Sequence, residues 1–297
     1  MGNSANRAPA VFWRAFCFST CLVAAGLAVG HAATAPAPAG PLAQIGLPDA
    51  AESARILERF RRAGLPGTFY WELELQQLPR RGATMIFKGR LWGAQTDRGP
   101  VLRLELADAE GRPVRLLIVS GSESAVWRSR GDAPALRLDS TELFLPAIPG
   151  VEITAFDLQR PFVFWPDVPA EKIVRKRGRP AHLFTLRPPA ASAAALGDLA
   201  AVRLYLDAQF NQSTEIELLA RDGRVTKTIS VNDLKNIGGQ HILKSLDVRN
   251  ETTRDKTRLL VTAAALDLAL PPDAFAPASL AADLPTPPAD RLVPLPK

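Results

Sequence analysis

The sequence of 297 residues predicts a mainly β protein of the α+β class, built on a curved antiparallel sheet of about ten or eleven strands. Apolar and polar residues alternate with a period of two along most of the chain, which is typical of strands with one buried face. Turn residues recur about every eight to twelve positions, as in an antiparallel meander. No strand–helix–strand pattern recurs, so a parallel α/β sheet is disfavoured.

The alternation is clearest in the first half of the chain. Phe69, Trp71 and Leu73 alternate with residues of mixed polarity, and similar runs follow near residues 85–91, 102–106, 114–119 and 127. Further strands are predicted at 171–174, 182–186, 202–206, 216–218, 225–231, 241–248 and 258–268. The Asp-Gly pair at residues 222–223 is a strong hairpin signal between two of them.

A helix is predicted over residues 49–63, ahead of the first strand. Asp49 supplies an N-cap and Glu52 completes a capping box. Ile56 and Phe60 lie on one apolar face, so the helix is amphipathic. We therefore expect it to pack on the sheet.

The segment 139–169 interrupts the strands with five prolines, a density that central strands do not tolerate. Thr154 is a suitable N-cap for a short helix there, and an aromatic patch follows it near residues 162–165. A sheet with one apolar face must close into a barrel, pair with a second sheet or curl around helices. The patch favours the third solution, with helices covering the concave face.

The two ends of the chain have a different composition. Residues 1–35 predict a cleavable signal peptide, because two arginines precede an apolar run that is shorter than the ~20 residues of a membrane-spanning helix. We therefore expect a periplasmic location. Residues 36–48 predict a flexible Pro/Ala linker and residues 281–297 a disordered Pro-rich tail, which leaves 49–280 as one folded domain.

Charge and cysteine content exclude several classes of function. Both cysteines, Cys17 and Cys21, lie in the predicted signal peptide, so the exported chain would have no thiol for a disulfide, a nucleophile or a metal ligand. The formal charge of +6 falls to +4 without that segment, because 34 basic residues then face 30 acidic ones. This excess is spread along the chain, so we expect no nucleic-acid partner, although it suits contact with anionic membranes.

The sequence also argues against catalysis. His182 and His241 are the histidines that remain after the signal peptide, and each falls in a predicted strand, where a lone histidine is usually structural. No metalloprotease, nucleophile-elbow, P-loop or dinucleotide-binding motif occurs. We expect no catalytic residues, no metal site, no cofactor and no enzymatic activity.

Four short motifs follow one another in the C-terminal third: Asp222-Gly223, Gly239-Gln240, Leu270-Pro271 and Asp273-Ala274-Phe275. In this order they resemble the outer-membrane lipoprotein-sorting protein family, the LolA-like periplasmic lipoprotein carriers. The segment from Phe156 to Asp167 resembles the middle helix of that family. The likeness extends over about residues 50–280. Asn236-Ile237 and the alanine run at 263–265 are not distinctive of the family, and the Pro-rich tail has no counterpart in it.

The resemblance implies an unclosed β-barrel whose concave face, covered by helices, forms a hydrophobic cavity. Its ligands would be the acyl chains of lipoproteins or another lipid. The expected function is that of a periplasmic carrier or chaperone that shields acyl chains for transfer towards the outer membrane, between inner- and outer-membrane protein donors and acceptors. The alternatives are a periplasmic regulatory or sensor module that binds a protein partner, and a periplasmic adaptor of a membrane lipid exporter.

The strand pattern and the resemblance together predict the residues of the site. The residues expected to line the cavity are Phe69, Trp71, Leu73, Met85, Phe87, Leu91, Leu104, Leu116 and Trp127. The residues expected to form a lid over it, which an acyl chain would displace, are Phe156, Phe162, Phe164 and Trp165. The alternative is that this patch is ordinary helix-on-sheet core. The basic turn of Arg175, Lys176, Arg177 and Arg179 is either a solvated loop or a contact for lipid headgroups or an acidic membrane partner.

Overall fold

A computed structural model describes residues 46–121 and 123–296. The predicted signal peptide and most of the predicted linker lie outside the described residues. The described residues belong to one compact unit. In the described part of the chain, no helix is both long enough and apolar enough to cross a membrane.

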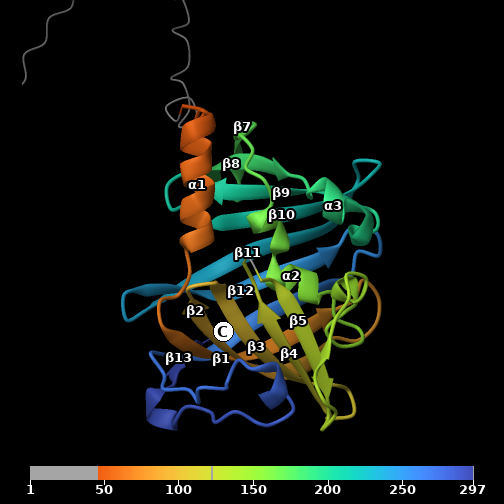
Figure 1. The fold of residues 1–297 in the computed structure, drawn as a ribbon, viewed down its shortest axis with the longest axis vertical. Coiled ribbons are helices and arrows are strands. Elements are labelled where there is room, and N and C mark those ends of the chain that lie inside the picture. Colours follow the sequence, from red (N-terminus) through yellow and green to blue (C-terminus); the bar gives the residue numbers. More distant parts are fainter. Residues whose placement is uncertain (1–45, 122, 297) are drawn as a thin grey trace, which may run out of the picture. The chain divides into compact units, whose positions relative to one another are not determined.

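One antiparallel sheet of 14 strands dominates the fold (Figure 1). Its strands are β1 (Thr68–Leu78), β2 (Met85–Thr96), β3 (Gly99–Ala107), β4 (Pro113–Val119), β5 (Ala125–Arg130), β6 (Leu136–Arg137), β7 (Lys172–Lys176), β8 (Arg179–Leu186), β9 (Leu199–Asp207), β10 (Ser213–Ala220), β11 (Val225–Ile237), β12 (Gln240–Asn250), β13 (Lys256–Leu266) and β14 (Val293–Pro294). The order across the sheet is β6-β5-β4-β3-β2-β1-β13-β12-β11-β10-β9-β8-β7, and β14 pairs with β13.

Pairing of β1 with β13 joins two antiparallel meanders in the middle of the sheet. The strands β6 and β7 form its outer ends, and no ladder joins one to the other among the described residues. The structure therefore confirms the prediction of a mainly β, curved and unclosed antiparallel sheet. The number of strands exceeds the predicted ten or eleven partly because β6 and β14 have two residues each, too few to show an alternating pattern.

Helical segments are few and mostly short. They are α1 (Ala50–Arg62), η2 (Glu142–Phe144), α2 (Ala155–Gln159), η3 (Pro161–Phe164), α3 (Ala190–Ala193), η4 (Ala194–Leu196), η5 (Pro277–Ser279) and η6 (Ala289–Arg291), where η marks a 3-10 helix. Figure 1 shows α1 beside the half of the sheet that contains β8, β9 and β10. The side-chain amide of Asn211, in the turn between β9 and β10, donates to the carbonyl oxygen of Ile56 at 3.1 Å and ties that turn to the helix.

The predicted N-cap of α1 is present. The carboxylate of Asp49 accepts a hydrogen bond from the backbone N–H of Glu52 at 2.8 Å. The Glu52 carboxylate pairs with Arg55 and Arg59 on the exposed side of the helix instead of completing the predicted capping box. The apolar face with Phe60 is buried, as the amphipathic pattern predicts.

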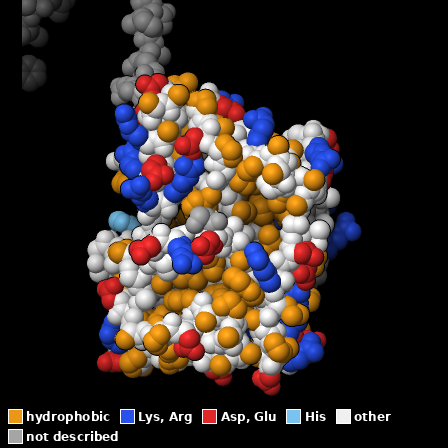
Figure 2. Space-filling view, viewed as in Figure 1, with side chains coloured by type: hydrophobic (Ala, Val, Ile, Leu, Met, Phe, Trp, Pro, Cys, Tyr) orange, Lys and Arg blue, Asp and Glu red, His pale blue; other side chains and the backbone are white. Residues whose placement is uncertain are grey.

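The main core lies on the concave side of the sheet. Alternate residues of the strands meet α1 and the segment 142–170 there, and together they form one continuous apolar cluster. Figure 2 shows apolar side chains gathered across the middle of the view, between the charged side chains of α1 and the C-terminal segment. The period-two pattern therefore predicts the buried face of most strands, because successive strand residues point to opposite faces.

On strands β1 to β5 the opposite face of the sheet is covered by the C-terminal segment, residues 267–296. Tyr70 and Trp92 are fully buried beneath it, and the Trp92 indole N–H donates to the carbonyl oxygen of Pro285 at 3.2 Å. Leu280 and Leu284 are also buried. The prediction of a disordered tail over residues 281–297 is therefore wrong for the described residues up to 296. Its prolines leave few backbone donors to satisfy, so an ordered segment can pack without regular secondary structure.

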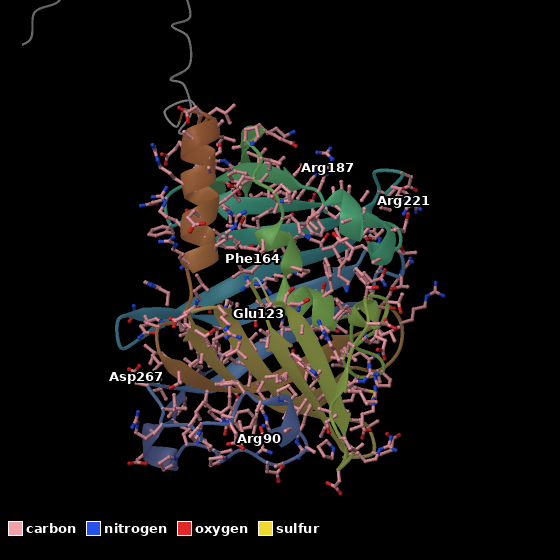
Figure 3. The ribbon with its side chains drawn as sticks, in the orientation of Figure 1. Arg90, Glu123, Phe164, Arg187, Arg221 and Asp267 are labelled. Atoms are coloured by element: carbon pink, nitrogen blue, oxygen red, sulfur yellow. The ribbon has the colours of Figure 1, made fainter. Side chains whose placement is uncertain are left out.

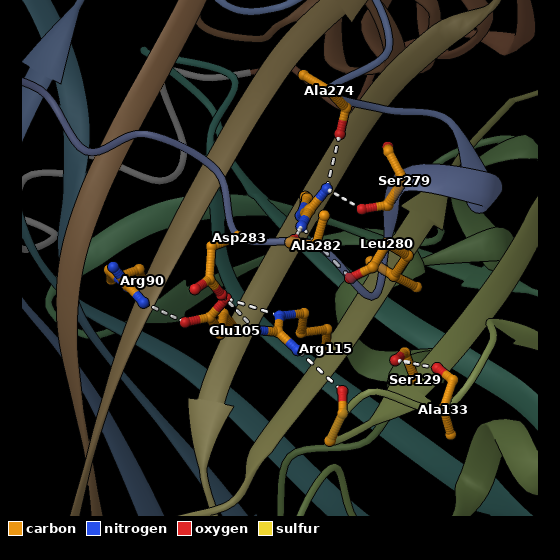
Figure 4. Close-up of polar contacts among 12 residues, drawn as sticks. Arg90, Glu105, Arg115, Ser129, Ala133, Ala274, Ser279, Leu280, Ala282 and Asp283 are labelled. Carbon is orange, nitrogen blue, oxygen red and sulfur yellow. Dashed lines mark hydrogen bonds and ion pairs between the residues drawn. The ribbon is translucent and has the colours of Figure 1, made fainter.

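Arg103 is the residue that most directly fixes this segment. Its side chain projects from β3 and is fully buried. The guanidinium donates to the carbonyl oxygens of Ala274 at 3.3 Å, Ser279 at 3.2 Å and Leu280 at 3.3 Å, and also to that of Ala282. Figure 4 shows these carbonyl groups converging on one side chain. Backbone carbonyls that would otherwise be buried without donors are thereby satisfied.

We predict that Arg103→Met lowers the free energy of unfolding by about 2–4 kcal/mol, because it leaves several buried carbonyl groups without a donor. Urea denaturation measures the change. The matched control is Arg98→Met, since the Arg98 side chain is 72% exposed and pairs with Glu123 at the surface; its cost should stay below about 1 kcal/mol. Equal costs for the two variants would contradict this assignment.

Candidate functional site

The apolar concave surface of strands β1 to β4 is the first component of the candidate site. The predicted cavity residues that are buried in its cluster are Phe69, Leu73, Phe87, Leu91, Leu104 and Leu116, with Trp71 partly buried against them. Gly93 lies opposite Phe69 in the ladder, and a Cβ there would come within 2.2 Å of the Phe69 ring. The glycine therefore lets this ring lie directly on β2.

Two predicted cavity residues are placed elsewhere, and both expectations need correction. Trp127 packs on the opposite face of the sheet, because its neighbour Val126 is the residue of β5 that points into the concave cluster. The Arg137 guanidinium lies 6.0 Å from the Trp127 ring. Met85 is 45% exposed at the first position of β2. The alternation identified both strands. It did not show that Trp127 lies on the opposite face or that Met85 lies at an exposed strand end.

The second component is the lid segment, which we define as residues 142–170. Phe156 and Phe162 are fully buried in the concave cluster, and Trp165 is 7% exposed. The rings form a chain of contacts: Phe144 stacks on Phe156 with centroids 4.6 Å apart, and Phe162 meets Trp165 edge-on at 6.4 Å. These rings cover the apolar face of the sheet.

The lid is folded by local interactions. Thr154 and Asp157 form a reciprocal capping box at the start of α2. Arg160 follows α2 in the left-handed region at φ 51°, which redirects the chain into η3. The predicted helix start at Thr154 is therefore confirmed. Since these backbone groups find partners nearby, the lid does not depend on a strand ladder with the sheet.

Phe164 does not belong to the buried part of the lid. Its side chain is 40% exposed, and Figure 3 shows it at the middle of the view, near the lower end of α1. In the 3-10 turn of η3, side chains three residues apart share a face. Phe162 and Trp165 share the buried side, so Phe164 points away from the concave surface. Its predicted role in covering the cavity is corrected accordingly.

Arg61 of α1 holds one end of the lid. Its guanidinium donates to the carbonyl oxygens of Val163 at 2.7 Å and Trp165 at 3.2 Å, and it pairs with the Asp167 carboxylate at 2.6 Å. The hydroxyl of Ser53, also on α1, accepts a hydrogen bond from the Ala170 backbone N–H at 3.0 Å. These polar contacts of side chains with backbone link the two segments in addition to the apolar cluster that they share.

The other end of the lid is held by β11. The Lys227 ammonium donates to Asp157 at 2.7 Å and to the carbonyl oxygen of Glu152 at 3.0 Å. Burial raises the pKa of the Glu152 carboxyl, which also accepts a hydrogen bond from Asn250. Because Lys227 and Asp157 are both largely buried, removing one partner would leave an uncompensated charge, at a cost of about 3–5 kcal/mol.

A third contact joins the lid to the end of β4. Ser120 donates to the carbonyl oxygen of Gln159, and the Gln159 side chain donates to the carbonyl oxygen of Val119, both at 3.0 Å. None of these holding residues was predicted from the sequence. Each joins positions about 39 or more residues apart, so no local pattern reveals them.

The predicted basic turn divides into two parts. The Lys176 ammonium lies 4.0 Å from the centre of the Tyr205 ring and pairs with Glu217 at 3.1 Å, as well as with Glu215. Its charge is therefore compensated, and hydrogen bonds from Lys176 and Tyr205 lower the pKa of Glu217 against the opposing effect of burial. Arg177, Arg179 and Arg175 are all exposed. Arg177 and Arg179 line a cavity of about 450 Å³, and Arg175 does not.

No metal-binding cluster of three or more His, Cys, Asp or Glu residues occurs in the described part of the chain. His182 lies in β8 and is largely buried, which lowers the pKa of its imidazole; Glu52 and Arg59 of α1 also act on it. A cavity of about 520 Å³ lies along β1, β2 and β3, and its lining includes the charged residues Glu72, Lys88 and Arg90.

No family model matches the chain, and no curated protein matches it. Solved structures do match in fold. A candidate outer membrane lipoprotein-sorting protein domain from Vibrio parahaemolyticus has a TM-score of 0.68 at 15% identity, covering 78% of this chain and 100% of that one. A DUF1329 family protein from Desulfovibrio piger has a TM-score of 0.67 at 12% identity, covering 78% of this chain and 98% of that one.

A third match is a LolA superfamily protein from Nitrosomonas europaea, with a TM-score of 0.58 at 15% identity. It covers 75% of this chain and 96% of that one. The chain therefore has the LolA-like fold, as the resemblance in its C-terminal third and middle segment implies.

We predict that Arg61→Ala speeds hydrogen exchange of the lid amides about tenfold, because it removes hydrogen bonds that hold η3 closed. The control is Arg62→Ala, since the Arg62 side chain is 81% exposed and pairs with Glu58 on the same helix. Exchange measured by mass spectrometry should change in the first variant only. The same acceleration in both would show that Arg61 does not hold the lid.

Burial of His182 predicts a pH dependence of stability. The lowered pKa means that the unfolded imidazole, with an ordinary value of about 6.5, binds a proton more readily than the folded one. Stability should therefore fall as the pH drops through about 6.5. In His182→Gln this fall should be reduced, whereas His241→Gln should retain it. Thermal unfolding at several pH values around 6.5 measures this loss of stability. Identical pH profiles for the unmodified protein and both variants would show that His182 does not cause it.

Proposed function

We propose that the protein is a periplasmic, non-enzymatic carrier that shields the acyl chains of a lipoprotein or another lipid on its concave face. The lid segment would give way to the acyl chain, and no covalent step is needed. The observation that carries the proposal is the set of buried lid rings, Phe156, Phe162 and Trp165, on the apolar surface of β1 to β4. The LolA-like fold supports it, since one structural match is a candidate lipoprotein-sorting domain.

The energies of lid and ligand are comparable. Three buried rings at about 2–3 kcal/mol each contribute about 6–9 kcal/mol to the closed lid. A sixteen-carbon acyl chain gains about 12 kcal/mol gross at ~0.8 kcal/mol per methylene, before association costs of about 4–15 kcal/mol. An acyl chain can therefore compete with the rings, while the closed lid prevents exposure of the apolar face.

The polar contacts at the lid's ends make this exchange reversible. Arg61, Ser120 and Lys227 hold backbone or carboxylate groups that can be hydrated when the lid moves. Water compensates much of the loss of a hydrogen bond at a surface, so each contact adds about 0.5–1.5 kcal/mol to closure. For the buried pair of Lys227 and Asp157 the opening must hydrate both charges together.

Transfer towards the outer membrane, with an inner-membrane donor and an outer-membrane acceptor, is part of the proposal. The test of the ligand class is native mass spectrometry of the protein purified from the periplasm, with organic extraction of what it carries. We expect bound lipid or an acylated peptide. A stoichiometric protein partner without lipid would instead support the regulatory alternative and contradict the carrier.

We predict that Trp165→Ala tightens the binding of a fluorescent fatty acid about tenfold, because the acyl chain no longer displaces that ring. Fluorescence titration measures the change. Phe164→Ala is the matched control: this ring is 40% exposed and lies next to Trp165 in the chain, so affinity should stay within about twofold. Unchanged affinity in Trp165→Ala would contradict the lid assignment.

A further inference from the structure

The cavity of about 450 Å³ lies where the β7–β8 turn, the β9–β10 turn and the hairpin of β11 and β12 meet. Its lining includes no residue of the lid segment and none of the predicted acyl-binding residues. Arg177 and Arg179 of the basic turn contribute to it, together with polar and apolar side chains of four further strands. It is thus a second, separate feature of the molecule.

Arg177 brings a positive charge to this cavity that no carboxylate neutralises within the described residues. The guanidinium donates to the carbonyl oxygen of Val231 at 2.6 Å and to the side-chain oxygen of Asn232 at 2.7 Å. Both acceptors are uncharged. The backbone of Arg177 is in the left-handed region at φ 50°, in a tight turn that helps to fix its position.

Two buried donors line the same cavity without a partner among the described residues. They are the hydroxyl of Ser213 and the side-chain amide nitrogen of Asn232. A buried donor without an acceptor costs about 1–3 kcal/mol. The carbonyl end of Asn232 is occupied by Arg177, and its buried amide nitrogen has no acceptor among the described residues. Together with Arg177 these groups favour an acceptor that carries negative charge.

The remaining charges limit that ligand to one negative charge. Arg179 is neutralised by Asp207, at 2.7 Å, and lies over the Phe210 ring at 4.6 Å. Asp233 is an exposed carboxylate in the lining, and it would repel a second negative charge. The apolar side of the cavity includes Phe210, which is 55% exposed, and Leu234. An amphiphile with a monoanionic group fits this combination.

We propose that this cavity binds the phosphodiester group of a phospholipid headgroup. Arg177, Ser213 and Asn232 donate to its oxygen atoms, and Phe210 and Leu234 contact the adjoining glycerol and methylene groups. The inference rests on the proposed function. A protein that shields the acyl chains of a lipid also meets the headgroup of that lipid, and this cavity would bind it. It assigns to Arg177 a role distinct from that of the neutralised Lys176 in the same turn.

The test uses glycerophosphoglycerol, the deacylated headgroup of phosphatidylglycerol, as the probe in an NMR chemical-shift titration. Arg177→Gln and Ser213→Ala should each weaken binding about tenfold. Arg175→Ala is the matched control, because it removes an equal charge from the same turn, is exposed, and does not line the cavity. Asp233→Asn should tighten binding, since it removes a repelling charge.

Three results would overturn the inference. The first is no Arg177-dependent shift with glycerophosphoglycerol. The second is an equal loss in Arg175→Ala, which would indicate diffuse charge attraction. The third is inorganic phosphate binding through Arg177 as tightly as glycerophosphoglycerol, which would identify a site for free phosphate.

The failure of this inference can be separated from the failure of the carrier proposal. A fluorescent fatty acid has no phosphodiester, so Arg177→Gln should bind it as the unmodified protein does. Loss of headgroup binding with fatty-acid binding intact overturns the cavity assignment alone. Arg177-dependent headgroup binding in a protein that binds no fatty acid supports the cavity and contradicts the carrier.

Discussion

The fold depends on covering the concave apolar face of an open sheet. Because β6 and β7 do not pair with each other among the described residues, the sheet cannot seal this face by closing into a cylinder. The helix α1 and the lid segment cover it instead. The capping box at Thr154 is internal to the lid, and the lid's remaining backbone contacts are with side chains such as Arg61, Ser120 and Lys227. It can therefore leave the surface without breaking a strand ladder.

The two faces of the sheet are covered in physically different ways. On the outer face the C-terminal segment is fixed by the carbonyl groups around Arg103, by the indole of Trp92 and by the pairing of β14 with β13. The side chains of Arg103 and Trp92 are buried, so an acyl chain offers no replacement for their hydrogen bonds. On the concave face the cover contributes aromatic rings, which an acyl chain can replace with equivalent apolar contact. Exchange of the cover is therefore expected on the concave face, where opening must also break the polar contacts of Arg61, Ser120 and Lys227.

The sequence contains enough information to predict the strands, the face that most of them bury and the caps at Asp49 and Thr154, because alternation and capping are local properties. It could not place Trp127, since a short strand has too few residues to define which face is inward. It could not reveal the order of the C-terminal segment, because the carbonyl groups of this segment accept hydrogen bonds from side chains about 170 residues away, as in the contact between Arg103 and Ala274. Arg61 and Lys227 were missed for the same reason.

The most direct test of the central claim is whether the lid moves when an acyl chain binds. Both cysteines lie before residue 36, so a chain lacking that segment accepts spin labels only at introduced sites such as Phe164→Cys in the lid and Arg221→Cys in the turn after β10. Double electron–electron resonance then measures the distance between the labels. The account predicts that saturating palmitate shifts the distribution to another, longer distance. An unchanged distribution with palmitate bound would contradict it.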